Sequence, residues 1–432
     1  MKKIRVLLIA EAANPEWVSV PLVGWSHARA LLDEVDAHLV TQVRNSDAIA
    51  RAGLVEGEDF TAIDSEVVAA PMHRVMSFIR KVTGLGWQFD TAMQAIPYYY
   101  FEHRLWKLFG KRIKAGEWDV VHRLTPLSPT IPSRLAARCK RAGVPFVWGP
   151  INGGVPWPKG FEDVLRREGE WLTYVRNAYK LMPGYASTQR DSACIVAGSI
   201  ATQSQLAPEA RERSVYIPEN AIDEARFGTP RSGPVSSPLS VAFVGRFVPY
   251  KGLDMLIEAS ADLVRAGKLK LDLIGDGPER PAVLAQIEAL GLGDGIAAEG
   301  WVEHRDLQAR LLRSDVLGFP SVREFGGGVV LEAMSLGLVP VVADYAGPAE
   351  LVTESTGFKI PFESREQLVA GTRAALEHLV AHPEQIRPMG EQARNRVLEK
   401  FTWPAKARQM VEVYRWVTGQ GERPDVGTPF AN

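Results

Sequence analysis

Short apolar runs of strand length alternate with helical patterns along most of the chain. In the first half the apolar runs are residues 4–10, 37–40, 120–121, 145–148, 194–197 and 215–218. In the second half they are residues 240–244, 270–274, 297–300, 316–320 and 339–343. Helical patterns lie between the runs at residues 26–35, 133–141, 253–266, 279–290, 305–313 and 328–336. This alternation is typical of parallel sheets covered by helices, and it predicts an α/β fold.

A Pro-, Ser- and Gly-rich cluster at residues 228–238 interrupts the pattern, and the same order of strand and helix then begins again. With 432 residues, the chain is long enough for two hydrophobic cores. We therefore expect two Rossmann-like domains, residues 1–217 and 218–400, that face each other across a cleft. Residues 401–432 begin with a last helical pattern and end in a Gly- and Pro-rich tail that we expect to fray.

The composition narrows the range of functions. Hydrophobic residues make up 46% of the chain and charged residues 23%, which is ordinary for a globular protein. The 50 Lys and Arg residues are balanced by 51 Asp and Glu residues, so no overall positive charge exists to hold nucleic acid. Cys139 and Cys194 have no Cys or His at ligand spacing and no Asp-x-Asp occurs, so no metal site is predicted. The N-terminal apolar run stops at Glu11, which indicates a cytoplasmic protein without a signal peptide.

Two cations follow the strand predicted at residues 240–244. Arg246 stands at its carboxyl end beside Gly245, and Lys251 follows five positions later, before a helix. Fixed cations beside a helix N-terminus suit a diphosphate, because the amide dipoles add to the point charges. The alternative is a pair of solvated charges in a loop.

Two carboxylates, Glu324 and Glu332, flank a glycine-rich turn between a strand and a helix. The backbone amides of this turn belong to Gly326, Gly327, Gly328 and Val329. Carboxylates accept hydrogen bonds from hydroxyl groups, while closely approaching amides at a helix N-terminus bind an anion. The arrangement therefore predicts a ligand that carries both hydroxyls and phosphates.

Together these pieces resemble the family 4 (group 1) retaining glycosyltransferases of the GT-B fold. The matching motifs, in the family's order, are Ile217-Pro218-Glu219-Asn220, Gly245-Arg246…Lys251-Gly252, Gly275-Asp276-Gly277-Pro278, Gly300-Trp301-Val302, Glu324-x7-Glu332-Ala333-Met334 and Ala346-Gly347-Pro348-Ala349-Glu350. One departure is the turn itself, where the family usually reads Glu-Gly-Phe-Gly and this chain has Glu324-Phe325-Gly326-Gly327. The resemblance implies a GT-B enzyme whose C-terminal helix crosses back to the first domain.

The resemblance also implies roles for single residues. Arg246 and Lys251 would neutralise the leaving nucleotide diphosphate, and Glu324 would lie against the donor sugar, as the catalytic residues. Glu332 would bind the ribose hydroxyls. The further donor-binding positions would be Gly326, Gly327, Gly328, Val329, Val302, Gly245 and Gly24.

The first half offers candidates for the acceptor side. The stretch ending in His122 resembles the family's strand-end Asp-x-x-His-x-His but lacks the second His. A buried packing residue is the alternative for His122. Asn152 and Gly153 follow a strand and are candidates too, with a tight turn as the alternative. For Gly24 the alternative to a donor contact is simply the start of a helix.

The resemblance thus implies a retaining glycosyltransferase that moves a sugar from a UDP- or GDP-sugar to a glycan or lipid-linked acceptor. It would act in bacterial cell-surface or exopolysaccharide synthesis and need no metal or other cofactor. A sugar-nucleotide epimerase or a glycan phosphorylase on the same fold is an alternative. A two-domain protein that binds a sugar without turnover is another.

Residues 72–116 carry eight Lys or Arg residues against Asp90 and Glu102, a net charge of +6, with Trp, Tyr and Phe residues between them. Such a helix suits a membrane interface, where rings lie at headgroup level and cations meet anionic lipid. The stretch predicts peripheral attachment to the inner face of the cytoplasmic membrane. The alternative is a helix whose aromatic residues are core and whose charges are solvated.

Overall fold

The computed structural model describes residues 3–72, 87–167 and 178–424, with the side chains of residues 87–94 excepted. The chain forms two compact units. The first unit contains the described residues of 3–154, 178–219 and 403–424, and the second contains residues 155–167 and 220–402. The domain division predicted at residue 217 therefore needs one correction. Residues 155–167 belong to the second unit, because Phe161 packs in its core.

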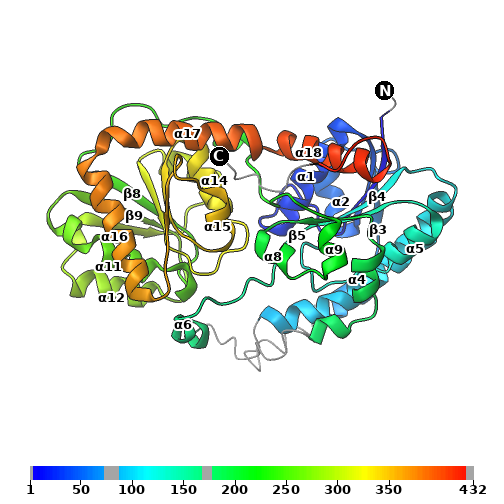
Figure 1. The fold of residues 1–432 in the computed structure, drawn as a ribbon, viewed down its shortest axis with the longest axis horizontal. Helices are drawn as coiled ribbons and strands as arrows, with labels where there is room; N and C mark the ends of the chain where they lie inside the picture. Colours follow the sequence, from blue (N-terminus) through cyan, green and yellow to red (C-terminus); the bar gives the residue numbers. More distant parts are fainter. Residues whose placement is uncertain (1–2, 73–86, 168–177, 425–432) are drawn as a thin grey trace. The chain divides into compact units, whose positions relative to one another are not determined.

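A seven-stranded parallel sheet with the order β3-β2-β1-β4-β5-β6-β7 forms the first unit (Figure 1). Its strands are β1 (Arg5–Ala10), β2 (Asp36–Gln42), β3 (Phe60–Ile63), β4 (Val120–Thr125), β5 (Phe146–Ile151), β6 (Cys194–Ala197) and β7 (Ser214–Tyr216). Along β1, Val6 and Leu8 enter one core while Leu7 and Ile9 enter the other. Because both faces are covered, this strand reads as a continuous apolar run.

Helices cover both faces of the first sheet. On one face α1 (Val20–Glu34) packs against α18 (Trp403–Val417), so the C-terminal helix belongs to the first unit (Figure 1). On the other face lie α4 (Trp87–Lys114) and α5 (Leu135–Ala142). The remaining helical elements of this unit are α2 (Ser46–Arg51), α7 (Tyr185–Asp191), α8 (Ile200–Ser204), α9 (Pro208–Glu212), η1 (Val43–Asn45) and η3 (Ala178–Leu181).

The second unit has its own six-stranded parallel sheet, with the order β10-β9-β8-β11-β12-β13. The strands are β8 (Leu239–Val244), β9 (Leu269–Ile274), β10 (Ile296–Gly300), β11 (Val316–Phe319), β12 (Val339–Ala343) and β13 (Phe358–Ile360). All of its pairings are parallel, and one continuous hydrophobic core fills the unit.

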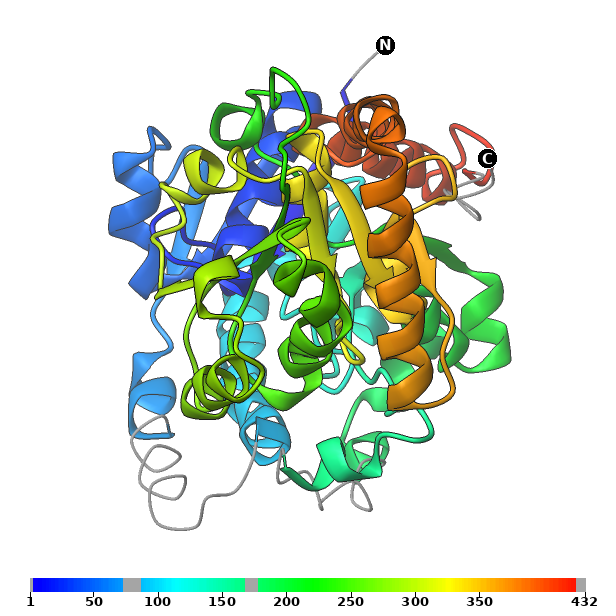
Figure 2. The same ribbon diagram turned by 90° about the vertical axis from the view of Figure 1, so that its left-hand side faces the viewer.

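Around this sheet, α11 (Leu253–Arg265) and α16 (Arg365–Ala381) pack against each other. Figure 2 looks onto this unit, with α16 drawn in orange in front of the yellow strands. The other helical elements are α6 (Glu162–Arg167), α10 (Glu224–Phe227), α12 (Arg280–Ala289), α13 (Leu307–Leu311), α14 (Gly328–Ser335), α15 (Ala346–Leu351), α17 (Ile386–Lys400), η4 (Pro249–Lys251), η5 (Gly293–Gly295) and η6 (Pro383–Gln385). Within the described ranges, no helix is both long and apolar enough to cross a membrane.

Candidate active site

The charged residues predicted in the second half gather where the second sheet changes its strand order. β8 lies between β9 and β11, so the chain leaves β8 on one side and returns on the other. Parallel sheets bind ligands at such a switch point, beyond the carboxyl ends of the strands. The loop after β8 carries Arg246 and Lys251, and the loop after β11 carries Glu324.

An ion pair joins these two loops. Nζ of Lys251, at the end of η4, contacts Oε2 of Glu324, and the two side chains are 14% and 19% exposed. The same ammonium group lies 4.9 Å from the ring centre of Phe319 in β11. The pair therefore places a cation suited to a phosphate and an acceptor suited to a sugar hydroxyl at one point of the sheet edge.

Beside this pair, the ends of β8 and β9 approach each other closely. Arg246 is exposed, directly after Gly245 at the end of β8. Gly275 follows β9 with a φ of 140°, and a Cβ atom built on it would lie 2.0 Å from the carbonyl oxygen of Gly245. The approach is possible only because residue 275 has no side chain.

The N-terminus of α14 provides backbone amides at the same edge. Gly327 caps the helix in the left-handed conformation, with φ 60° and ψ 36°, which strains other residues. Gly326 is buried, and the amides of Gly328 and Val329 lie in the first turn, where helix amides have no intrahelical acceptor. The side chain of Asn220 approaches to 3.7 Å of a Cβ built on Gly328. This helix end is suited to an anion.

Glu332 lies in the second turn of α14 and contacts a residue that the sequence analysis missed. Its Oε1 is 3.0 Å from Nε2 of His304, and this hydrogen bond raises the pKa of His304 although burial opposes the shift. Val302 packs against the second unit's core, whereas Trp301 is 68% exposed. The position of His304, two residues after the Gly300-Trp301-Val302 motif, is the signal that could have found it.

Residues 155–167 also reach this site, although no motif marked them. The guanidinium carbon of Arg323 lies 4.8 Å from the ring centre of Trp157 and 5.6 Å from that of Phe325. The hydroxyl of Tyr345, which precedes α15, donates to the carbonyl oxygen of Pro156 at 2.8 Å. Because Arg323 precedes Glu324 in the chain, the contact with Trp157 restrains the neighbour of that carboxylate.

In the first unit, the acceptor-side role of His122 stays a prediction, and the contacts of its side chain are those of a packing residue. His122 is fully buried in β4. Its Nε2 donates to the carbonyl oxygen of Gly149 at 2.6 Å, and its Nδ1 accepts from the hydroxyl of Tyr414 in α18 at 2.6 Å. Burial lowers the pKa of His122 to about 4, so the ring is neutral. With both nitrogens engaged, His122 docks the C-terminal helix, which is the packing alternative.

Asn152 is likewise committed inside the first unit. It is 9% exposed, and its Nδ2 donates to Oε1 of Glu219 at 2.7 Å. Its Oδ1 accepts from the hydroxyls of Ser199 at 3.0 Å and Thr202 at 3.2 Å. The amide of Gly153 also donates to the Thr202 hydroxyl, at 3.2 Å. These bonds join both residues in one turn of the first unit, and their acceptor-side role stays a prediction.

The predicted helix started at residue 26, after Gly24. In the structure α1 begins at Val20, so Gly24 lies inside the helix. A Cβ atom on Gly24 would lie 2.1 Å from the carbonyl oxygen of Ala12 and 2.9 Å from Cγ2 of Thr125. The glycine therefore lets α1 pack closely on the loop that follows β1. Its contact with a donor stays a prediction.

The stretch predicted for a membrane, residues 72–116, is only partly described. Residues 73–86 and the side chains of 87–94 lie outside the described residues. In α4 the rings of Tyr98, Phe101 and Phe109 are at most 3% exposed, and they pack in the core of the first unit. For these three rings the core alternative is right, because a buried ring cannot reach lipid.

The described residues contain no group of three or more His, Cys, Asp or Glu side chains that could hold a metal ion. The sequence predicts that the reaction needs no metal ion. This stays a prediction, because it concerns the reaction with its substrates bound.

Solved structures show which fold the two units make. The chain superposes on the structure of Anabaena Alr3699/HepE in complex with UDP with a TM-score of 0.59 and 16% identity, over 96% of this chain and 99% of that one. Sucrose-phosphate synthase from Thermosynechococcus elongatus gives a TM-score of 0.60 and 17% identity, over 96% and 100% of the two chains. Two Rossmann-like units that match these proteins define the GT-B fold, as predicted.

Sequence comparison points to the same class. Residues 230–396 match the family model described as glycosyl transferases group 1. Alpha-D-kanosaminyltransferase of Streptomyces kanamyceticus is 31% identical over 222 residues, which are 49% of this chain and 56% of that protein. The lipopolysaccharide core biosynthesis glycosyltransferase LpsE of Rhizobium meliloti is 26% identical over 250 residues, 55% of this chain and 69% of that protein. The chain spans about half the length of the first of these curated relatives, and the family-model match is confined to residues 230–396.

Proposed function

We propose that this protein is a retaining glycosyltransferase of family 4, which moves a sugar from a UDP- or GDP-sugar to a glycan or lipid-linked acceptor. The observation that carries the proposal is the ion pair of Lys251 and Glu324 at the switch point of the second sheet. Arg246 lies in the same loop as Lys251. Glu332 and the first amides of α14 belong to the helix that follows the loop of Glu324. All of them lie within residues 230–396, the stretch that matches the group 1 family model.

In the proposed reaction, the bond between the sugar's anomeric carbon and the diphosphate oxygen breaks while a bond to the acceptor oxygen forms on the same face. The departing phosphate oxygen takes the acceptor proton. Arg246, Lys251 and the amides of Gly328 and Val329 stabilise the negative charge that develops on the diphosphate. Binding of the donor separates Lys251 from Glu324, whose carboxylate then accepts from sugar hydroxyls.

The chain's own cations supply the charge that a metal would otherwise provide, so the proposed reaction needs no metal. The donor class is supported by the relatives' names, which are those of sugar transferases, and by the UDP bound in the HepE structure. LpsE takes its name from lipopolysaccharide core biosynthesis. We therefore place this enzyme in bacterial cell-surface polysaccharide synthesis, on the cytoplasmic side of the membrane.

Binding and turnover of nucleotide-sugars test the proposal. UDP, GDP and ADP are titrated against the wild type by calorimetry, and release of the free nucleotide from the matching UDP- or GDP-sugars is then followed. One of the nucleoside diphosphates should bind, and the enzyme should release the same nucleotide from the corresponding nucleotide-sugar. Lys251→Ala should slow release by roughly 10²–10³-fold, the scale for losing one donor to a transition-state charge.

Lys268→Ala is the matched control, because it removes an exposed lysine from the same unit, outside both loops. It should release nucleotide at the wild-type rate. An epimerase would convert the sugar and keep the nucleotide attached, and a binding protein would show affinity without release. Either result, or full activity of Lys251→Ala, would overturn the proposal.

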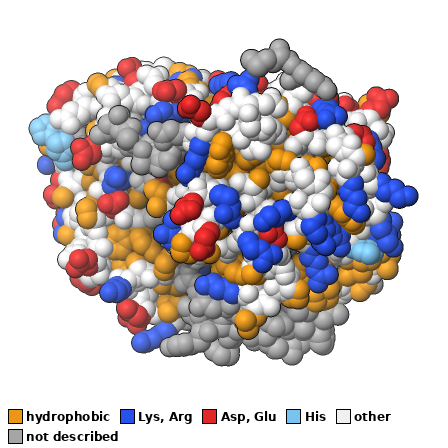
Figure 3. All heavy atoms as spheres, turned by 45° about the vertical axis from the view of Figure 1, so that its right-hand side comes forward, with side chains coloured by type: hydrophobic (Ala, Val, Ile, Leu, Met, Phe, Trp, Pro, Cys, Tyr) orange, Lys and Arg blue, Asp and Glu red, His pale blue; other side chains and the backbone are white. Residues whose placement is uncertain are grey.

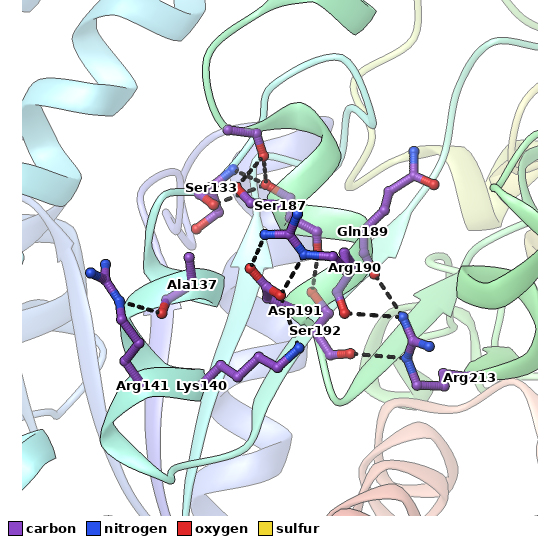
Figure 4. Close-up of polar contacts among 12 residues, drawn as sticks. Ser133, Ala137, Lys140, Arg141, Ser187, Gln189, Arg190, Asp191, Ser192 and Arg213 are labelled. Atoms are coloured by element: carbon purple, nitrogen blue, oxygen red, sulfur yellow. Dashed lines mark hydrogen bonds and ion pairs between the residues drawn. The ribbon is translucent and has the colours of Figure 1, made fainter.

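We also propose that the first unit attaches to an anionic membrane surface through the exposed end of α4. Lys107 and Lys111 are exposed, have no carboxylate partner among the described residues, and flank Leu108, which is 53% exposed. Figure 3 shows Lys and Arg side chains gathered on the face of the first unit that comes forward in that view. Part of the nearby charge is neutralised, since Asp191 of α7 accepts from Lys140 at 3.0 Å and from Arg190 at 2.9 Å (Figure 4).

A further inference from the structure

The carboxylate of Glu332 is held from one side by the imidazole of His304. The Nε2–Oε1 distance is 3.0 Å, although the two residues are 28 positions apart in the chain. The side chains are 33% and 18% exposed, so both are partly withdrawn from water while one edge stays accessible. A carboxylate oxygen only accepts hydrogen bonds here, which places the imidazole proton on Nε2.

His304 is itself fixed from behind. Its ring centre lies 5.4 Å from that of Phe227 in α10, and Phe227 is buried in the core of the second unit. The charged groups that face His304 are Glu332 and, more weakly, Arg226 of α10, whose charge opposes the protonated ring. The imidazole therefore cannot turn away from Glu332 without losing its packing on a core aromatic ring.

This contact uses Oε1 of Glu332 and leaves Oε2 without a hydrogen-bond partner among the described residues. A carboxylate that is free to rotate loses conformational entropy when a ligand orders it, and a carboxylate already held in place does not. One oxygen is thus anchored, and the other remains for a hydroxyl pair on the ligand.

We propose that His304 is a positioning residue of the nucleotide site, which holds Glu332 so that its second oxygen meets the ribose hydroxyls of a nucleoside diphosphate. The inference rests on the proposed function and adds to it a residue that acts through Glu332. It separates ribose recognition from phosphate recognition, because His304 contacts neither Lys251 nor the amides of α14 in any hydrogen bond that the described residues form.

Binding measurements with matched ligands test this role. The nucleoside diphosphate that the wild type prefers, its 2′- and 3′-deoxy analogues and inorganic pyrophosphate are titrated against wild type, His304→Ala and His304→Gln. His304→Ala should bind the ribonucleotide about five- to tenfold more weakly, the effect of one lost rotamer restraint. His304→Gln keeps an N–H donor of similar reach and should stay within about threefold of the wild type.

The loss should depend on the ligand. For pyrophosphate, and for the analogue that lacks the hydroxyl bound by Glu332, His304→Ala and the wild type should agree within about twofold. His304→Ala should also have no further effect once Glu332→Ala is present. His382→Ala, an exposed histidine of the same unit, is the control and should bind every ligand as the wild type does.

Two results would overturn the inference while leaving the proposed function intact. The first is an unchanged affinity of His304→Ala for the ribonucleotide. The second is an equal loss for the ribonucleotide, the deoxy analogues and pyrophosphate, which would indicate general damage to the unit. A wild type that binds none of the nucleoside diphosphates would overturn the proposed function and the role of His304 with it.

Discussion

His27 of α1 is 2% exposed, and neither of its ring nitrogens has a hydrogen-bond partner among the described residues. Its ring centre lies 5.9 Å from that of Trp403 and 6.4 Å from that of His122. Desolvation lowers the pKa of His27 well below the ordinary value of 6.5, and the nearby amine of Lys406 adds to the shift. At this position a titratable side chain serves as packing, at a cost to stability.

We predict that His27→Leu stabilises the protein, and more so in acid. Removal of two unsatisfied buried nitrogens should raise the free energy of unfolding by about 1–3 kcal/mol at pH 8. Below pH 6.5 the unfolded wild type binds a proton at His27 that the folded wild type does not bind. The stability of the wild type therefore decreases as the pH is lowered, and the variant lacks this decrease. The difference should widen by about 2 kcal/mol at pH 5, measured by denaturant titration.

His103→Gln provides the comparison, because it removes an exposed imidazole from α4 of the same unit. Its free energy of unfolding should stay within about 0.5 kcal/mol of the wild type at both pH values. A His27→Leu difference that is constant or smaller at pH 5 would mean that His27 is not held neutral in the folded protein.

Single residues also show how far the sequence could predict the site. Spacing along the chain singled out Arg246, Lys251, Glu324 and Glu332 as candidates, because they follow strand ends or flank a glycine-rich turn. It could not predict that Lys251 pairs with Glu324, 73 positions away, since that contact depends on β8 lying beside β11. For His122 the offset could not predict that both ring nitrogens are engaged, since one of the two contacts comes from Tyr414 of α18, 292 positions away.

At the level of elements, the pattern predicted the central strands of both sheets and missed two at the edges. The missed strands are β3 (Phe60–Ile63) and β13 (Phe358–Ile360), which end their sheets. They have four and three residues and a neighbour on one side only, so they leave little apolar signal. Strands buried on both faces form continuous apolar runs and were easy to find.

Residues 155–167 could not be placed by any local pattern, because their partners lie far along the chain. They follow β5 of the first unit but pack with the loops after β11 and β12 of the second. The stack of Trp157 on Arg323 restrains the loop that carries Glu324. Residues 155–167 therefore restrain one loop of the candidate active site.

We predict that Trp157→Ala slows nucleotide release from the preferred sugar donor by about tenfold, because small displacements of a reacting group are costly. The donor KM should change by less than about threefold, since Glu332 and the amides of α14 do not depend on the stack. Trp157→Phe keeps an aromatic face and should recover most of the rate. Steady-state kinetics of the two variants give both parameters.

Lys159→Ala, an exposed residue of the same segment, should behave as the wild type. If Trp157→Ala keeps the full rate, the contact of Trp157 with Arg323 does not position Glu324. If its KM rises while the rate is unchanged, the segment contributes to donor binding and not to the position of the catalytic loop.

Over the whole molecule, positive and negative residues are nearly equal in number but unevenly distributed along the chain. The net charge is −1, yet residues 72–116 carry an excess of +6. In α4 the rings of Tyr98, Phe101 and Phe109 are buried, and Arg138 of α5 lies 5.2 Å from the ring centre of Trp106. What remains for a membrane is a set of exposed lysines with Leu108 among them, so attachment would be mainly electrostatic.

We predict that the full protein floats with vesicles that contain anionic lipid at low salt and is released at high salt, as expected for charges screened beyond a Debye length. Lys107→Gln with Lys111→Gln should weaken binding by about tenfold or more, because each cation near such a surface contributes about 1 kcal/mol. Lys268→Gln with Lys270→Gln removes two exposed charges from the second unit and should change nothing. Equal losses in both pairs would indicate a response to net charge alone. No binding at low salt would exclude this surface, and a soluble acceptor would then be the better proposal.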